Sequence, residues 1–253
     1  MKFRIARKLS YLKKARHRHG HGIHSPFLFH LITEVIENKK NFSAYKVLRD
    51  QRDRLSHLIK YNSGGLEIQT LIDAILISSR RKNIFKAVEL PFRYGKLLLR
   101  LVNEFKPKTI SCYGPSFGLN LLYLGLSDNS IPVNFFQSDH YLQQISEETL
   151  KDADVQNVNY CEKEDHPNEF TDFVFINMPF FPDEAEELIS AQLASPIENN
   201  VMIVRGIHES ERMELIWKKV IENKRVKISL DLFEIGIVLF QNNLQKEHFV
   251  LRF

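Results

Sequence analysis

The residues of this chain that could do chemistry gather in three places, and the first is a glycine-bearing run at residues 113–120. Gly114, Ser116 and Gly118 alternate there with larger residues. Glycines let a backbone pass close to a ligand, and the first amides of a following helix can hold polar groups. The same letters spell Gly-x-Ser-x-Gly, in which Ser116 would be the nucleophile of a hydrolase and a later histidine its base. A plain glycine turn is a third interpretation, so the run by itself leaves the chemistry open.

The second place is a histidine-rich passage near the N-terminus. His17, His19, His21 and His24 lie within eight residues, and imidazoles at such spacing can bind zinc or nickel. No cysteine or carboxylate stands beside them to close a structural site. A metal site therefore competes with a loop in which His24 and Ser25 begin a helix, since a serine hydroxyl followed by proline is typical of a helix start.

The third place is a basic arm. The first 33 residues hold eight lysines and arginines and no carboxylate, so the remaining 220 carry 27 basic against 31 acidic side chains, a net charge of −4. Residues 3–15 can form a helix in which Ile5, Leu9 and Leu12 share one face. The arm could contact the phosphate backbone of a nucleic acid or an anionic membrane surface. The alternative is a solvated helix face packed against the acidic remainder.

Composition excludes several classes of protein. The 253 residues are 43% hydrophobic, and the 19 Phe and 8 Tyr argue against disorder. Two cysteines exclude a disulfide scaffold. No run approaches the roughly 20 apolar residues of a membrane-spanning helix, and the charged start lacks the apolar centre of a secretory signal. We therefore expect a cytoplasmic location.

The elements that must position these residues change character at Pro107. Residues up to Phe105 carry helical patterns, whereas beyond Pro107 strand-like runs (109–113, 133–137, 158–161, 172–176, 201–204) alternate with helical ones (119–126, 141–150, 183–193, 211–221). Three further strand candidates follow at 226–230, 235–241 and 248–253. We predict a basic arm and helical cap over 1–106 and a doubly wound α/β domain over 107–253. Its sheet should be mostly parallel with an antiparallel C-terminal edge, because the last connections are short.

Several stretches resemble one family, the class I S-adenosylmethionine-dependent methyltransferases, and within it a bacterial branch similar to small-molecule O-methyltransferases. The resemblance is carried by His21 to Phe27, Tyr94 to Leu98, Pro107 to Ile110, Ser229 to Phe233, Gly236 to Val238, and His248 to Phe249. It implies a Rossmann-like methyltransferase sheet that binds S-adenosylmethionine. The cofactor-binding residues it implies are Gly114, Ser116 and Gly118 after the first strand and Gln137 and Ser138 after the second.

The chain departs from the family pattern where the family carries acids, at Cys112, Gln137, Asn177 and Arg205. A neutral amide accepts a bond of about 0.5–1.5 kcal/mol against about 1.5–3 kcal/mol for a charged group, so a weakened cofactor site is expected. Asp139 would replace Gln137 if the register of the second strand slipped by two residues. Asn177 and Arg205 remove the anionic oxygen ligands that a hard divalent cation needs, so no metal is expected.

The resemblance thus implies methyl transfer to a small-molecule acceptor without a metal. Alignment of donor and acceptor supplies much of the catalysis of such an in-line displacement, and His140 and His208 are the candidates to take the acceptor's proton. The lost acids equally favour a catalytically lapsed member, a pseudoenzyme that keeps the fold as a binding or scaffolding module. A serine esterase using Ser116 is the third hypothesis. The acceptor and the oligomeric state are not indicated.

Overall fold

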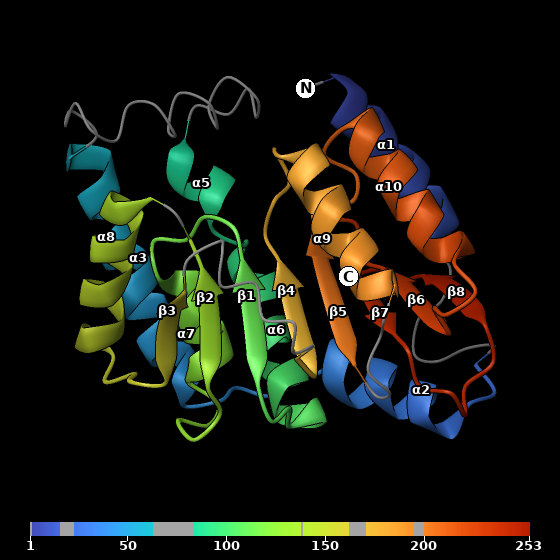
Figure 1. The fold of residues 1–253 in the computed structure, drawn as a ribbon, viewed down its shortest axis with the longest axis horizontal. Helices are drawn as coiled ribbons and strands as arrows, with labels where there is room; N and C mark the ends of the chain where they lie inside the picture. Colours follow the sequence, from blue (N-terminus) through green and yellow to red (C-terminus); the bar gives the residue numbers. More distant parts are fainter. Residues whose placement is uncertain (1, 16–22, 63–82, 138, 162–170, 195–199) are drawn as a thin grey trace. The chain divides into compact units, whose positions relative to one another are not determined.

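The structure is a computed structural model that describes residues 2–15, 23–62, 83–137, 139–161, 171–194 and 200–253 (Figure 1). The chain divides into two compact units. One unit comprises Lys40–His166, and the other comprises Met1–Lys39 together with Pro167–Phe253.

The unit of residues 40–166 places three parallel strands among helices. In chain order its described elements are α3 (Ala44–Asn62), α5 (Ile84–Val88), α6 (Phe92–Phe105), β1 (Ile110–Tyr113), α7 (Leu119–Gly125), β2 (Val133–Phe136), α8 (His140–Asp152) and β3 (Val158–Cys161). Strand β2 lies between β1 and β3, with Val133 opposite both Ile110 and Val158. Helix crossovers between successive parallel strands are what the alternating pattern predicts.

The packing of this unit depends on a small residue in α6. A Cβ on Gly95 would lie 2.1 Å from the ring of Tyr123 in α7, so only glycine leaves room for that buried tyrosine. Helix α7 is buried along its whole length, as expected of a helix covered by other elements on every side. Core packing against α6 therefore fixes the position of α7.

The other unit combines the N-terminal helices with the C-terminal strands. Its described elements are α1 (Lys2–Lys14), α2 (Pro26–His30), the π-helix η1 (Leu31–Ile36), β4 (Phe173–Ile176), α9 (Pro182–Ala194), β5 (Val201–Arg205), α10 (Glu211–Glu222), β6 (Ile228–Asp231), β7 (Ile235–Leu239) and β8 (Glu247–Val250). The strand order is β4-β5-β7-β6-β8. Strands β4 and β5 are parallel, β7 is antiparallel to both β5 and β6, and β8 is parallel to β6.

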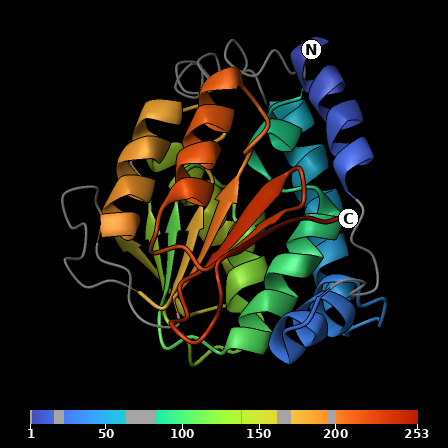
Figure 2. The same ribbon diagram turned by 90° about the vertical axis from the view of Figure 1, so that its right-hand side faces the viewer.

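Helices cover this second set of strands on both faces. Figure 2 shows the orange helices α9 and α10 against one face and the blue α2 on the other. Trp217 of α10 packs on β7 at Gly236, where a Cβ would lie 2.4 Å from the indole. The helix start predicted at Ser25 is confirmed, because the Ser25 hydroxyl accepts a hydrogen bond from the Leu28 amide and Pro26 is the first helical residue.

The predicted fold class is confirmed: the chain is α/β, with a mostly parallel Rossmann-like arrangement and an antiparallel C-terminal part. In the described ranges all elements before Pro107 are helical. The domain boundary between residues 106 and 107 stays a prediction. Among the described residues no helix has both the length and the apolarity needed to cross a bilayer.

Candidate functional site

The glycine run forms the loop between β1 and α7, and its backbone is unusual at both ends. Gly114 has φ of 102° and Gly118 has φ of 104°, in the left-handed region that residues other than glycine rarely adopt. The Gly114 amide donates to the carbonyl of Phe136 at 3.4 Å, which ties the loop to the end of β2. The loop is therefore a defined turn at the carboxyl ends of two neighbouring parallel strands, where ligands of such folds bind.

A buried carboxylate from outside the loop organises it. Glu89 follows α5 and is 1% exposed. Its Oε1 accepts hydrogen bonds from the Ser116 hydroxyl at 3.0 Å and the Phe117 amide at 2.6 Å, and its Oε2 accepts one from the Asn120 amide at 2.9 Å. The Gly118 amide donates to Ser116 Oγ at 3.0 Å. These three amides are thus satisfied inside the protein.

The carboxylate of Glu89 also lies near Cys112 of β1. Burial, and then the negative charge of Glu89, raise the pKa of the Cys112 thiol well above its usual value, so Cys112 is a neutral buried thiol with a carboxylate nearby. Sequence analysis missed Glu89. The available signal was an acid between the apolar Val88 and Leu90, since a charged residue in an apolar run is buried only when it is paired.

The geometry of Ser116 does not support the esterase hypothesis. Its side chain is fully buried, and its hydroxyl donates to Glu89 while accepting from Gly118. A serine nucleophile needs access to substrate and a histidine within hydrogen-bond reach. Ser116 acts here as a bridge that holds the loop.

Gly118 serves the packing of α7 against α8. A Cβ at this position would lie 2.7 Å from Cβ of Thr149 and 3.1 Å from Cα of Ser146. The Thr149 hydroxyl in turn donates to the Phe117 carbonyl at 3.0 Å. The requirement for glycine at 118 is therefore structural in the first instance.

The end of β2 presents a polar atom that lacks a partner. Gln137 follows the last residue of β2, and its buried Nε2 has no hydrogen-bond partner among the described residues. Beside it, the rings of Tyr113 and Phe136 stack with centroids 4.6 Å apart and an interplanar angle of 12°. A buried amide nitrogen without a partner is uncommon and needs an explanation, and a ligand at the strand ends would provide one.

Of the described residues just beyond Gln137, Asp139 has a structural role. Asp139 is the N-cap of α8 and accepts from the Leu142 amide at 2.9 Å, so one oxygen of its carboxylate is engaged within α8, and the choice of Gln137 over Asp139 as the cofactor ligand stays a prediction. His140 is exposed in the first turn of α8, with its Nε2 3.3 Å from Nε2 of Gln144. Ser138 lies outside the described residues.

In the other unit, the positions of two expected acids form an internal pair. Arg205 Nη1 donates to Asn177 Oδ1 at 2.8 Å, and both side chains are buried. Among the described residues no group of three or more His, Cys, Asp or Glu could hold a metal ion. His17, His19 and His21 lie outside the described residues, so the hypothesis of an N-terminal metal site stays open. A cation at position 205 disfavours a second cation beside it.

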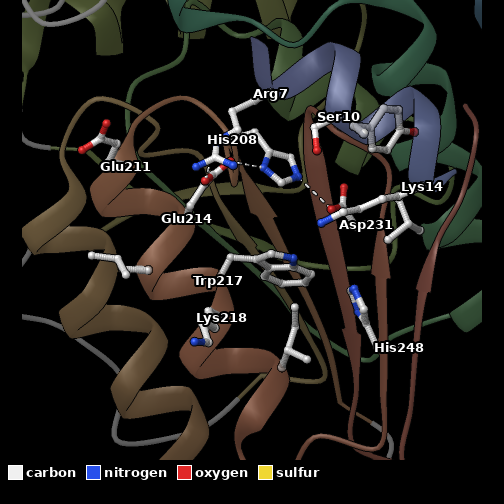
Figure 3. A pocket seen from close by; sticks show the side chains of 14 residues that line it. Arg7, Ser10, Lys14, His208, Glu211, Glu214, Trp217, Lys218, Asp231 and His248 are labelled. Atoms are coloured by element: carbon white, nitrogen blue, oxygen red, sulfur yellow. Dashed lines mark hydrogen bonds and ion pairs between the residues drawn. The ribbon is translucent and has the colours of Figure 1, made fainter. Parts of the chain in front are cut away.

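His208 lies between two carboxylates on the wall of a cavity of about 590 Å³. Figure 3 shows its ring between Glu214 and Asp231, with Trp217 below. The Nδ1 atom is 2.8 Å from Glu214 Oε1, and Nε2 is 2.7 Å from Asp231 Oδ2. Burial lowers the pKa of His208, but the hydrogen bonds and charges of the two acids outweigh that effect and leave the pKa raised.

This geometry makes His208 a poor general base. A general base needs a ring nitrogen that can take a proton from the substrate. Both ring nitrogens of His208 are instead engaged by carboxylates, and both donate to them when the ring is protonated. The other candidate, His140, has an exposed ring. The two histidines belong to different units.

Comparison with known proteins shows a shared fold. An O-methyltransferase, TomG, from Streptomyces achromogenes in complex with SAM matches with a TM-score of 0.53 at 15% identity, over 72% of this chain and 98% of that one. The SAH-bound methyltransferase PaMTH1 from Podospora anserina matches with a TM-score of 0.54 at 14% identity, over 81% and 99%. An O-methyltransferase from Bacillus cereus in complex with SAH gives 0.51 at 14%, over 74% and 97%. No protein-family model and no curated protein sequence matches. The chain therefore has the fold of these methyltransferases.

Proposed function

We propose that this protein binds S-adenosylmethionine on the loop of residues 114–118 and at the end of β2, and that it transfers the methyl group to a small-molecule acceptor without a metal. The observation that carries the proposal is the buried amide nitrogen of Gln137, which has no hydrogen-bond partner in the part of the chain that the structure describes. It lies in the same unit as the loop, on a fold shared with methyltransferases that were solved with SAM or SAH. The ribose hydroxyls of the cofactor can both donate and accept, as can the amide of Gln137.

The charge of the site suits this cofactor better than a phosphate. Glu89 has already engaged the Phe117 and Asn120 amides, and these are the donors that a phosphate would need at the start of a helix. Its carboxylate disfavours a second anion. S-adenosylmethionine carries a carboxylate too, but its sulfonium and ammonium groups make it a net cation, which a nearby negative charge attracts.

S-adenosylmethionine, when bound, supplies an electrophilic methyl group. The residues of the chain would then hold the donor and exclude water from it. Gln137 would orient the ribose, and the loop held by Glu89 would keep the nucleoside in place. His140 remains the candidate to accept a proton from a hydroxyl acceptor, because its ring is exposed.

A second candidate function is a lapsed methyltransferase that binds the cofactor or its product without turnover. The buried pair of Arg205 and Asn177 favours it, because the resemblance to the family implies acids at these two positions. The double engagement of His208 favours it too. In this function the same cofactor site would serve as a binding or scaffolding module.

Calorimetric titration of the full chain with S-adenosylmethionine and S-adenosylhomocysteine tests the proposal. We expect one saturable site per chain. Gln137→Leu should weaken binding about fivefold through the loss of a neutral hydrogen bond. Gln137→Glu exchanges the donor Nε2 for a charged oxygen that accepts from a ribose hydroxyl, so it should tighten binding about tenfold. The matched control is Gln156→Glu, an exposed glutamine in the same unit, which should leave the affinity unchanged.

Once binding has been measured, an assay of methyl transfer distinguishes the two functions. Radioactive methyl transfer from S-adenosylmethionine to small molecules of a cell extract, weakened by Gln137→Leu, supports the enzyme. Binding without transfer to any extract fraction supports the lapsed methyltransferase. No heat and no thermal stabilisation at millimolar ligand would overturn both.

A further inference from the structure

Helix α1 packs against its own unit through its charged face. Arg4 Nε lies 3.3 Å from Glu209 Oε2, and its guanidinium also pairs with Glu234. One turn later, Arg7 Nε lies 3.0 Å from Glu214 Oε2. Surface helices normally turn an apolar stripe inward, whereas in the first two turns of α1 the inward contacts are arginine–carboxylate pairs. The acidic surface of the unit thus holds α1 by charge.

An aromatic side chain completes this anchor. Tyr11 is buried, and its hydroxyl donates to the carbonyl of Leu251. Its ring lies with its centroid 5.2 Å from that of Phe233. The orientation of α1 about its own axis is therefore fixed by contacts on two successive turns and is not free to reverse.

As a result, the apolar face of α1 points to solvent. The side chains of Ile5, Leu9 and Leu12 are 55%, 59% and 41% exposed. Spacings of four and three residues place them along one side of a helix. Lys8 and Lys13 are also exposed, and at 100° per residue they lie on either side of that line. The Nζ atom of Lys8 also lies 5.9 Å from the centroid of the Phe233 ring, so Lys13 is the lysine of the pair that points away from the unit. We call this surface the α1 ridge: three aliphatic side chains flanked by two lysines.

We propose that the α1 ridge docks onto an anionic lipid bilayer surface, with Ile5, Leu9 and Leu12 at the boundary of headgroups and acyl chains and Lys8 and Lys13 at the lipid phosphates. A helix with an apolar face bordered by lysines lies in the plane of the interface. Helix α1 has 13 residues and is about 20 Å long, enough to lie on the surface and too short to span.

The charges favour this occupant over two others. A nucleic acid backbone would pair with lysines but offers nothing to three aliphatic side chains. A second copy docked ridge to ridge about a two-fold axis would bring the flanking lysines of both copies together, which costs free energy. Beyond the first 33 residues the chain has a net charge of −4, so an anionic bilayer attracts the arm and repels the remainder, which orients the protein.

Sedimentation of the full chain with phospholipid vesicles tests this inference. We expect binding to vesicles of 30% phosphatidylglycerol in phosphatidylcholine, negligible binding to phosphatidylcholine alone, and release as salt is raised. Ile5→Ser with Leu9→Ser should lower the partition coefficient roughly 25-fold, about fivefold for each half-exposed side chain. Lys13→Gln should lower it about fivefold.

The matched control is Leu215→Ser, because Leu215 of α10 is also 55% exposed but lies outside the α1 ridge. Its partition coefficient should equal that of the wild type, and all variants should keep the wild-type unfolding midpoint. The inference is overturned by absence of binding to phosphatidylglycerol vesicles, or by binding that the Ile5 and Leu9 substitutions leave intact. A dimer that these substitutions dissociate would show that a second copy covers the ridge and would equally overturn it.

Discussion

Replacing Glu89 by glutamine should destabilise the protein severely, because one carboxylate holds the loop after β1. Hydrogen bonds to a charged group contribute about 1.5–3 kcal/mol each and neutral ones about 0.5–1.5 kcal/mol. In Glu89→Gln the amide oxygen keeps two of the three bonds at neutral strength, a loss of about 2 kcal/mol. The new NH₂ group meets the Asn120 amide donor-to-donor, which removes the third bond and costs about 1.5–3 kcal/mol more. We expect the free energy of unfolding to fall by about 3–5 kcal/mol, a large part of the stability of a typical domain.

Urea unfolding followed by circular dichroism at pH 7 measures this change. Glu148→Gln is the matched control, since Glu148 is an exposed acid of α8 in the same unit and should change the free energy by no more than about 0.5 kcal/mol. The glutamine preserves the volume of the side chain, so no cavity contributes. If Glu89→Gln unfolds within about 0.5 kcal/mol of the wild type, the carboxylate does not organise the loop and the reasoning is refuted.

Three further predictions concern other parts of the chain. At pH 6, His208→Gln should lower the free energy of unfolding by about 2–4 kcal/mol. Because the pKa of His208 is raised in the folded state, the stabilisation by its imidazolium is complete below about pH 6.5 and is lost as the pH rises past the folded-state pKa. Urea unfolding at pH 9 should therefore show a smaller difference between variant and wild type, and an equal difference at both pH values would contradict the paired imidazolium. Gly118→Val should lower the thermal midpoint without any ligand, since its Cβ meets Thr149 at 2.7 Å; an unchanged midpoint in a thermal scan would exclude that clash. Ellman's reagent should modify Cys161 in the native protein and Cys112 only after unfolding, because burial and a nearby carboxylate raise the pKa of the Cys112 thiol; two rapidly reacting thiols would contradict this.

Local patterns predicted the framework of the site well. The strand-like runs ending at Tyr113 and Gln137 became β1 and β2, because buried parallel strands read as short apolar runs. The turn containing Gly114 and Gly118 follows from local glycine chemistry. Glu89 could not be found in this way, since the residues that it bonds lie 27–31 positions further along the chain.

Helix α1 illustrates the same limit. Its periodicity correctly placed Ile5, Leu9 and Leu12 on one face, but it could not tell which face turns inward. The pairs of Arg4 with Glu234 and of Arg7 with Glu214 decide that, across more than 200 positions of the chain. Periodicity shows which side chains share a face of the helix. Which face turns toward the protein depends on contacts with segments far away in the sequence.

The central claim is that S-adenosylmethionine binds at the loop after β1 and the end of β2. Ultraviolet cross-linking of methyl-tritiated S-adenosylmethionine, followed by trypsin digestion, tests it most directly. No lysine or arginine lies between Lys108 and Lys151, so one peptide of residues 109–151 carries both Gly114 and Gln137. We predict saturable label on this peptide that excess S-adenosylhomocysteine removes. Saturable label confined to other peptides, or no saturable label at millimolar cofactor, would contradict the claim.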